Sequence, residues 1–406
     1  MVIGDNIFGR MTNSYWQIKG GMNVSKLGSA DFRKKYDIAV IGGGITGIAT
    51  AYFLQKFECE NVIVLEKNAV GYGASGRNAG FLLAGLSEPY SRLKVGMGDE
   101  SARELMAATT ENHDLIAAAI EENRIDCQYS RSGSYHLATS PVERKECEDT
   151  VESLIRDGFK AEIIDNPPGL NAKSDYYKGG YFYPSDGCLN PYMFVKGLSK
   201  DIDIVEGFEV ESILKSKGSL VISGPGGEVK SEMAVMATNG YSPLLDRYFE
   251  RLIYPIRGQM TATLPVDIRN LNESIYYANF GYDYFRQSVD NSILMGGLRN
   301  RYLSEETGFE DEENPALQKD LEQYIRNNLG ISEFGIFARW SGLMAATIDG
   351  LPVVGSLPHN SAVIVNAGFN GHGFGLGMIV ARDLAAAIVN GESSFILKRF
   401  SLRRFL

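Results

Sequence analysis

Three glycines, Gly42, Gly44 and Gly47, stand between a short apolar run and a segment whose apolar residues recur at helical spacing. A second apolar run, residues 61–65, ends at Glu66. The G-x-G-x-x-G spacing allows a tight turn, a close approach of the backbone to a pyrophosphate, and close packing of a helix on a strand. The N–H groups at the helix start favour phosphates, and Glu66 would accept hydrogen bonds from ribose hydroxyls and disfavour a 2′-phosphate. The pattern predicts a dinucleotide site other than one for NADP, with a bare packing turn as the alternative.

A second glycine-rich stretch lies near the other end of the chain. Residues 366–377, NAGFNGHGFGLG, carry five glycines and lead into an apolar segment that predicts a helix over about 371–390. The amides and the positive end of a helix suit a group that becomes negatively charged, and glycine lets the backbone approach a ligand closely. The alternative is a glycine-rich turn before a helix that only packs in the core.

The segment after the first α/β unit distinguishes between NAD and FAD, which share the adenosine-binding pattern. Residues 71–83, GYGASGRNAGFLL, resemble the second flavin-contacting segment of the D-amino-acid oxidase, glycine oxidase and sarcosine oxidase group of flavoproteins. The chain is similar to the gamma-glutamylputrescine oxidoreductase-like branch in four ordered motifs, at Ser14–Trp16, Gly73–Asn78, Trp340–Gly355 and Gly368–Gly373. The resemblance implies an extended FAD, with its pyrophosphate at the first glycine loop and its isoalloxazine ring at the second.

The resemblance also implies which residues contact the cofactor. They are Gly42, Gly44, Ile45, Thr46, Gly47, Glu66, Lys67, Gly73, Ala74, Ser75, Arg77, Asn78, Ala79, Gly80, Val210, Ala237, Thr238, Asn239, Gly342, Gly368, Phe369, Asn370, Gly371, His372 and Gly373. Val210 is expected on a strand, and is equally well explained as a core residue. The two positions that carry an attachment cysteine or histidine in some relatives hold Gly342 and Arg77 here, so non-covalent FAD is expected.

The reaction that the resemblance implies is oxidation of the C–H bond next to an amine nitrogen, with hydride transfer to flavin N5 and hydrolysis of the imine. Met344 stands where amino-acid oxidases of this group hold the substrate carboxylate with an arginine, so a simple α-amino acid is not expected. Gly375 replaces a lysine that promotes reaction with O2 in sarcosine oxidase-like members. The expected substrate is a secondary amine, a polyamine derivative or an N-substituted amino acid, and the electron acceptor is O2, a partner protein or a quinone.

Four residues are candidates for catalysis and contact with this substrate. Arg257 and Arg286 are basic groups on expected strands, and Tyr284 alternates with Tyr282 at a period of two, which places both tyrosines on one face. His372 stands beside the expected flavin edge. An aromatic wall with a nearby cation suits an amine that carries a distal acidic group. The alternatives are a packed strand face, surface ion pairs, and, for His372, a structural hydrogen bond.

The patterns divide the chain into α/β ends and a β-rich middle. Helices are expected over 78–86, 100–124 and 316–328, among others. The predicted fold class is α/β with mixed β, a discontinuous Rossmann-like FAD-binding domain with an inserted α+β substrate domain built on a mostly antiparallel sheet. The predicted boundaries are 1–35 for an N-terminal extension, 36–90, 196–245 and 345–406 for the FAD-binding domain, and 91–195 and 246–344 for the substrate domain. Tyr15 and Trp16 are expected to pack on the body if the extension is ordered.

Composition narrows the class of protein further. The 406 residues carry a net charge of −10, which argues against nucleic acid as a partner because phosphate binding needs a basic face. No apolar stretch of about 18 residues predicts a membrane span. The four cysteines and four histidines have no metal-ligand spacing, so a metal-free, reduced, cytoplasmic protein is expected, with a homo-oligomer left open.

Three rival interpretations remain at this level. The chain is the catalytic subunit of an amino-acid dehydrogenase complex of the proline or sarcosine type, or a flavoprotein with no turnover, or a Rossmann dehydrogenase that binds NAD alone. A colourless purified protein would favour the last, and a flavin that no substrate bleaches would favour the second.

Overall fold

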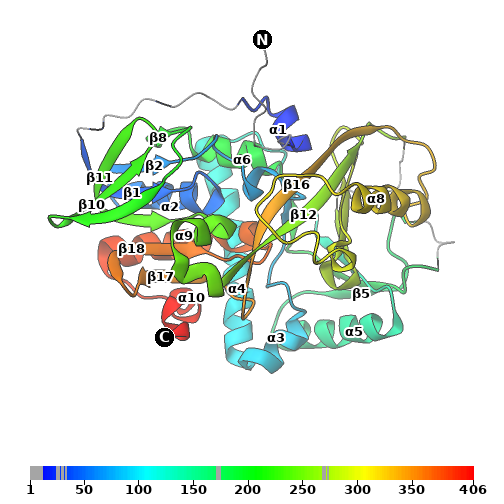
Figure 1. Cartoon of the computed structure of the whole chain (residues 1–406). Coiled ribbons are helices and arrows are strands. Elements are labelled where there is room, and N and C mark those ends of the chain that lie inside the picture. Colours follow the sequence, from blue (N-terminus) through cyan, green and yellow to red (C-terminus); the bar gives the residue numbers. More distant parts are fainter. Residues whose placement is uncertain are drawn as a thin grey trace, which may run out of the picture.

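Figure 1 shows the computed structural model, which describes residues 12–23, 28, 32, 34–170, 175–267, 271 and 274–406. The other residues of the predicted N-terminal extension, 1–11, 24–27, 29–31 and 33, lie outside this description. Two eight-stranded sheets and one two-stranded sheet organise the described residues. The first sheet lies on the left of Figure 1 and the second on the right.

The first sheet is built around the strand that precedes the first glycine loop. Its strand order is β17–β18–β11–β1–β2–β8, with β10 paired to β11 and β9 paired to β10. The strands are β1 Lys35–Ile41, β2 Val62–Leu65, β8 Ile204–Val205, β9 Ser212–Ser216, β10 Ser219–Gly224, β11 Gly227–Met236, β17 Val353–Leu357 and β18 Asn360–Ala367. The run from β18 through β11, β1 and β2 to β8 is parallel. Every residue of β2 is buried, as expected for a parallel strand covered on both faces.

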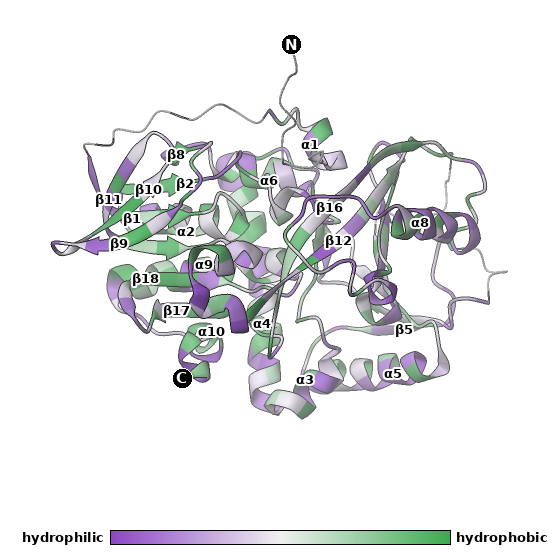
Figure 2. Cartoon of the chain, viewed as in Figure 1, coloured by the Kyte–Doolittle hydropathy of each residue, from purple (hydrophilic) through white to green (hydrophobic). Residues whose placement is uncertain are grey.

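Two helices that start at glycine-rich loops lie side by side against this sheet. They are α2, Ile45–Lys56, and α9, Gly373–Asn390. By length and composition α9 could cross a membrane, but most of it is buried against α2 and against α4, Asp99–Asn123. It therefore has the burial of a core helix. In Figure 2, strands β1 and β18 of the sheet beneath these helices have the colour of apolar residues.

The second sheet is mostly antiparallel, with the order β16–β12–β15–β14–β13–β4–β6–β5. Its strands are β4 Ser134–Leu137, β5 Glu162–Ile164, β6 Gly180–Tyr183, β12 Ile253–Thr263, β13 Ile275–Ala278, β14 Asp283–Gln287, β15 Ile293–Gly297 and β16 Ile336–Thr347. β13 and β4 run parallel, while the other described pairs are antiparallel. Helix α8, Pro315–Asn327, matches the predicted helix at 316–328 and packs against β12 and β15, with the hydrophilic surface seen in Figure 2.

One predicted helix is wrong. Residues 78–86 form strand β3, Phe81–Leu82, which pairs with β7, Gly187–Cys188. Gly80 and Gly85 adopt φ of 77° and 86°, a left-handed backbone that interrupts helical geometry on both sides of the strand. The remaining helices are α1 Tyr15–Lys19, α3 Tyr90–Met97, α5 Pro141–Arg156, α6 Pro191–Leu198, α7 Ser242–Leu245 and α10 Phe395–Arg399, with short 3-10 turns η1 Ala74–Gly76, η2 Asn239–Tyr241, η3 Arg247–Arg251, η4 Asn279–Gly281, η5 Arg299–Arg301 and η6 Leu402–Phe405.

Helix α1 packs on the body, as expected for Tyr15 and Trp16. The Trp16 side chain is fully buried, and its Nε1–H donates to the Asn78 carbonyl at 2.7 Å. Gln17 donates to the Tyr72 carbonyl at 2.8 Å, and the Ser14 hydroxyl donates to the Gly76 carbonyl at 2.5 Å. The helix therefore holds the backbone of the segment that carries the GASGRN motif.

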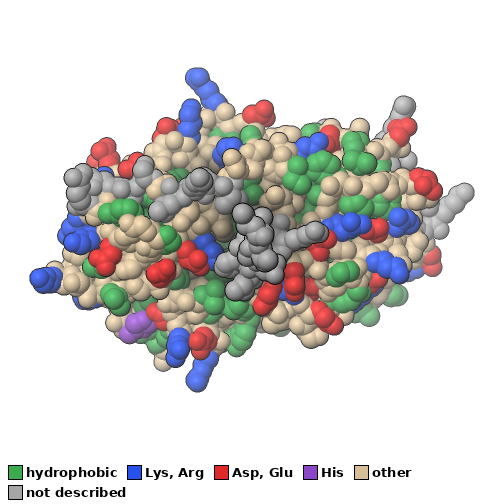
Figure 3. Space-filling model, turned by 45° about the horizontal axis from the view of Figure 1, so that its top comes forward, with side chains coloured by type: hydrophobic (Ala, Val, Ile, Leu, Met, Phe, Trp, Pro, Cys, Tyr) green, Lys and Arg blue, Asp and Glu red, His purple; other side chains and the backbone are tan. Residues whose placement is uncertain are grey.

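Charged side chains of both signs are interspersed over the face of the molecule shown in Figure 3. A face with interspersed charges of both signs favours solubility and attracts a strongly charged polymer only weakly.

Candidate active site

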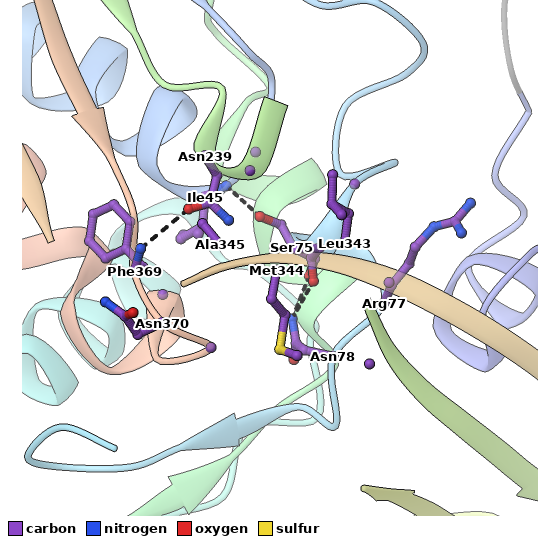
Figure 4. A pocket seen from close by; sticks show the side chains of 18 of the residues that line it. Ile45, Ser75, Arg77, Asn78, Asn239, Leu343, Met344, Ala345, Phe369 and Asn370 are labelled. Atoms are coloured by element: carbon purple, nitrogen blue, oxygen red, sulfur yellow. Dashed lines mark hydrogen bonds between the residues drawn. The ribbon is translucent and has the colours of Figure 1, made fainter. Parts of the chain in front are cut away.

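A cavity of about 1040 Å³ is lined by residues from both large sheets and from both glycine-rich loops. The starts of α2 and α9 lie next to each other in its wall, where a Cβ on Gly373 would be 4.0 Å from Ile45 Cγ2. The end of β2 and residues of β12, β14 and β16 also line it. Segments from near the two ends of the chain thus face the same cavity. Figure 4 shows part of this cavity, with Ile45 and Phe369 drawn from the two helix-entry segments.

Around the start of α2, the cavity is lined by backbone amides, a hydroxyl and a fixed carboxylate. The Ile45 N–H donates to the Ser75 hydroxyl at 2.8 Å (Figure 4). The Glu66 carboxylate accepts N–H bonds from Gly43 at 2.6 Å and Asn68 at 2.8 Å. Removal from bulk water raises the pKa of Glu66, and these two N–H bonds oppose that shift. A helix start beside a carboxylate at the end of the next strand is the arrangement that binds pyrophosphate and ribose.

The three glycines of the first loop are required for different structural reasons. Gly42 adopts φ of 109°, and a Cβ there would lie 2.7 Å from the Ala237 carbonyl oxygen. A Cβ on Gly47 would collide with the Gly42 carbonyl oxygen. A Cβ on Gly44 would approach only the Ser75 hydroxyl, at 3.0 Å, and Gly44 lines the cavity. Gly42 and Gly47 are therefore needed for packing, whereas Gly44 leaves room for a ligand.

Before α9, the cavity is lined by a loop that two asparagines hold in place. The Asn239 side-chain oxygen accepts N–H bonds from Gly368 at 3.0 Å and Phe369 at 3.3 Å (Figure 4). The Asn370 side-chain oxygen accepts the Thr347 N–H at 2.8 Å. Within this loop Asn370 and Gly371 have positive φ. The two asparagines fix the approach of the backbone to the start of α9.

Helix α9 begins at the cavity without a side-chain cap from the described residues. Gly373 and Phe374, in its first turn, line the cavity. The first N–H groups of a helix have no partner within the helix, and they carry partial positive charge. This end can therefore stabilise negative charge on a bound group.

His372, the residue before α9, is buried and lines the cavity. Burial lowers the pKa of its imidazole, so the ring is neutral at neutral pH. Its Nδ1 lies 3.2 Å from the Asn370 carbonyl oxygen, which can only accept. We therefore place the ring hydrogen on Nδ1, which leaves the Nε2 lone pair available.

An aromatic wall also lines the cavity. Tyr277, Tyr282 and Tyr284 all contribute to the cavity, together with Met260 and Met344. Burial raises the pKa of Tyr277 to about 12 and also raises that of Tyr284, so both phenols stay neutral and can donate hydrogen bonds.

Asp283, between two residues of this wall, gives a pH-dependent prediction. It is fully buried, burial raises its pKa to about 6, and Tyr176 and Asn279 donate to it. A carboxyl whose folded pKa exceeds its unfolded value stabilises the fold below about pH 4, and this contribution is lost as pH rises through about 6. We compare the free energy of unfolding of Asp283→Asn with that of the unsubstituted protein. The difference should shift in favour of the variant by about 2 kcal/mol when the pH is raised from 4.5 to 7.5. Urea unfolding of both proteins at the two pH values measures this, and a difference independent of pH would contradict it.

Most predicted cofactor residues line the cavity. They are Gly42, Gly44, Ile45, Thr46, Glu66, Lys67, Gly73, Ala74, Ser75, Arg77, Asn78, Ala79, Val210, Ala237, Thr238, Asn239, Gly342, Phe369, Asn370, Gly371, His372 and Gly373. Gly47, Gly80 and Gly368 are outside this set, and a Cβ at each would meet neighbouring atoms. Val210 lies at the cavity but not on a strand, since β9 begins at Ser212. Figure 4 shows the Arg77 side chain pointing away from the other labelled side chains.

Two of the four predicted catalytic residues, Arg257 and Arg286, lie outside the described lining of the cavity. Arg257 pairs with Glu306, Glu310 and Glu312 of the acidic segment before α8, and so holds that segment. Arg286 lies beneath α1, with its guanidinium 5.7 Å from the Trp16 ring centroid. Tyr284 lines the cavity, but a period of two in the sequence could not show which neighbour buries a charged residue on the same strand.

The sequence interpretation missed two cations of the cavity, Arg92 and Arg299, of which Arg92 pairs with Glu146. Arg299 is the one without a carboxylate partner among the described ion pairs. It follows β15 and a Gly-Gly pair, Gly296 and Gly297. A glycine pair at the end of a strand predicts a turn, and this pair was the sequence feature that could have indicated a turn beside the cavity.

The chain matches the family model described as DAO, FAD dependent oxidoreductase, over residues 37–387. The chain belongs to this family. As an FAD-dependent oxidoreductase, it resembles gamma-glutamylputrescine oxidoreductase of Escherichia coli, with 27% identity over 370 residues that cover 88% of this chain and 84% of that protein. It is 26% identical to glycine oxidase of Geobacillus kaustophilus over 399 residues, covering 92% of this chain and 98% of that protein.

Solved structures agree with this assignment. Glycine oxidase from Geobacillus kaustophilus superposes with a TM-score of 0.75 and 25% identity, covering 92% of this chain and 99% of the other. L-proline dehydrogenase from P. horikoshii has the same fold, with a TM-score of 0.75 and 21% identity over 92% of this chain and 98% of its own. The predicted fold class, the FAD cofactor and the oxidoreductase activity of this FAD-dependent family are confirmed. The domain boundaries and individual site residues stay predictions.

Proposed function

We propose that this FAD-dependent oxidoreductase oxidises the C–H bond next to the nitrogen of a secondary amine, a polyamine derivative or an N-substituted amino acid. The carrying observation is the single cavity that is lined by the glycine loop at Gly44 and the Glu66 carboxylate and also by His372 and the aromatic wall. A cofactor with phosphates and a redox ring needs both kinds of lining, helix amides with a carboxylate and an aromatic wall.

The residues present fit non-covalent FAD. The N–H groups of Gly44 and Thr46 would hold the pyrophosphate, beside the Ser75 hydroxyl that accepts the Ile45 N–H, and Glu66 would hold the adenosine ribose. The start of α9 would stabilise negative charge on the reduced ring, by up to about 2 kcal/mol in a partly buried site. The room beside Gly44, where a Cβ would meet only a hydroxyl, supports this placement.

Bound FAD supplies the two-electron acceptor for the hydride that leaves the substrate carbon. The protein's part is to bind the amine against the wall of Tyr277, Tyr282 and Tyr284, and to keep water away from the carbon. Neutral His372, with Nε2 free, would accept a proton from the substrate ammonium, because a lone pair on nitrogen is needed for imine formation. No second acid or base is required before the imine hydrolyses in water.

We also propose that a partner protein or quinone takes the electrons better than O2 does. Gly375 occupies the position of a lysine associated with O2 reaction in similar oxidases. A side chain there would collide with the Leu83 carbonyl oxygen, so α9 and residue 83 pack too closely to admit one. The four cysteines are unpaired thiols, which supports a reducing compartment such as the cytoplasm as the place of action.

An anaerobic titration tests this function. Addition of amines to the purified yellow protein should bleach the flavin band at roughly 450 nm, a property of the cofactor itself. Slow return of colour after air is admitted, with fast return after a quinone is added, would support the proposed acceptor. A flavin that no amine bleaches would favour a protein without turnover, and fast return with air would make it an oxidase.

A further inference from the structure

Arg299 differs from the other cations that line the cavity. In Lys67, Arg77 and Arg92, the charge pairs with a carboxylate of the protein at 2.7–2.9 Å. Among the residues that the structure describes, no carboxylate lies within ion-pair distance of Arg299. Half-buried Arg299 therefore keeps its charge available to the cavity.

The turn that presents Arg299 is fixed by backbone contacts. Leu298, immediately before it, is buried and adopts φ of 58°, which is unfavourable for a residue with a branched side chain. The Leu298 N–H donates to the Tyr282 carbonyl oxygen at 2.7 Å. Gly297 adopts φ of 120°, and a Cβ there would collide with the same oxygen. The Arg299 turn and the aromatic wall are thus held against each other.

The Arg299 side chain lies among the groups of that wall. Its guanidinium carbon is 5.0 Å from the centroid of the Tyr282 ring, which restrains the plane of the fork. Its positive charge acts to lower the pKa of Tyr277, Tyr284 and His372, so it lies near all three. An anion beside Arg299 would meet the guanidinium fork and neutral phenol donors together.

We propose that Arg299 binds a carboxylate carried by the amine substrate. This inference rests on the proposed function and narrows it to amines that bear an acid group. The guanidinium fork matches the two carboxylate oxygens, and Tyr277 and Tyr284 supply further donors.

Arg299 projects from a different part of the sheet than the arginine position of amino-acid oxidases, which holds Met344 here. Met344 is on β16, whereas Arg299 follows β15, and β12 lies between these strands. Two strand spacings separate the two backbone positions by about 10 Å, and the Met344 Cε and the Tyr284 hydroxyl both reach the space above Gly258, at 3.2 and 3.5 Å from its Cβ position. The receptor therefore suits an acid group in a different place from that of a simple α-amino acid.

The test uses Arg299→Met, which removes the charge but keeps an unbranched side chain, and Arg301→Met as the matched control. Arg301 is in the same short turn but is exposed, pairs with Asp320 and does not belong to the described lining of the cavity. Both variants should keep bound flavin. Pentanoate and pentanamide, which contain no oxidisable amine, serve as binding probes through perturbation of the flavin spectrum.

We expect Arg299→Met to weaken pentanoate binding about 10- to 100-fold and to leave pentanamide binding unchanged, the range for a charged hydrogen-bonded pair. Arg301→Met should change neither. A second measurement compares KM for N-methyl-4-aminobutanoate with that for N-methylbutylamine, and Arg299→Met should raise only the first. Equal losses in both arginine variants, or no preference for the carboxylate in the unsubstituted protein, would overturn the inference. If N-methylbutylamine bleaches the flavin as readily as the acid does, the proposed function stands without the receptor.

Discussion

Replacing Gly44 with valine should give a folded protein that retains little or no FAD. Gly44 has φ of −82° and ψ of −177°, a conformation that valine adopts readily. Its added side chain would enter the cavity beside Ser75, in the space assigned to the pyrophosphate. Overpacking of this kind costs about 1–3 kcal/mol, which weakens FAD binding about 5- to 150-fold.

The measurement is the ratio of flavin absorbance to protein absorbance after purification, with far-UV circular dichroism to show that the fold is intact. Gly96→Val is the matched control, because a Cβ at Gly96 meets nothing within 4 Å and this residue is outside the described cavity lining. Undiminished flavin in Gly44→Val would show that the phosphates lie elsewhere.

The neighbouring glycines sharpen the same test. Gly42→Val and Gly47→Val should also lose flavin, but together with stability, because each new side chain meets a backbone carbonyl oxygen. Only Gly44→Val separates loss of the ligand from loss of the fold.

The elements at the two helix entries could be predicted because local rules determine them. A buried run, a glycine turn and helical spacing gave β1 and α2, and the same reasoning gave α9, where the structure has them. Phe81 and Leu82 could not be placed in this way. Their apolar neighbours have helical spacing, but pairing with Gly187–Cys188, about 100 residues away, determines their conformation.

The substrate side of the cavity was harder to predict for the same reason. Arg257, Arg286 and Arg299 are all basic residues in or beside strands, and sequence alone does not distinguish them. Their surroundings do: acidic neighbours neutralise Arg257, α1 covers Arg286, and a left-handed Leu298 presents Arg299 to the cavity. Partners far apart in the chain decide which charge stays available.

The second large effect is expected at Arg77, which was predicted to touch the cofactor but whose hydrogen bonds go to the protein. Its guanidinium donates to Asp311 at 2.8 Å, to the Thr12 carbonyl oxygen at 2.6 Å and to the Ser341 carbonyl oxygen at 3.0 Å, while its Nε–H donates to the Tyr72 carbonyl oxygen at 2.9 Å. The side chain is only 4% exposed. Arg77 therefore joins the N-terminal segment, the acidic segment before α8, strand β16 and the motif that lines the cavity.

Arg77→Met should lower the free energy of unfolding by about 3–5 kcal/mol, because it leaves Asp311 and several buried carbonyl groups without their donor. Arg156→Met is the control: Arg156 is exposed and pairs with Glu152 one helical turn away, so its removal should cost less than about 1 kcal/mol. Arg77→Lys should recover only part of the loss, since one ammonium cannot replace a planar fork that reaches four partners.

Urea unfolding of the flavin-free proteins at low and high salt makes the comparison, and the cost at Arg77 should change little with salt because the pair is largely buried. Equal costs at Arg77 and Arg156 would mean that the contacts of Ser14, Trp16 and Gln17 hold the N-terminal segment and the GASGRN motif together without Arg77.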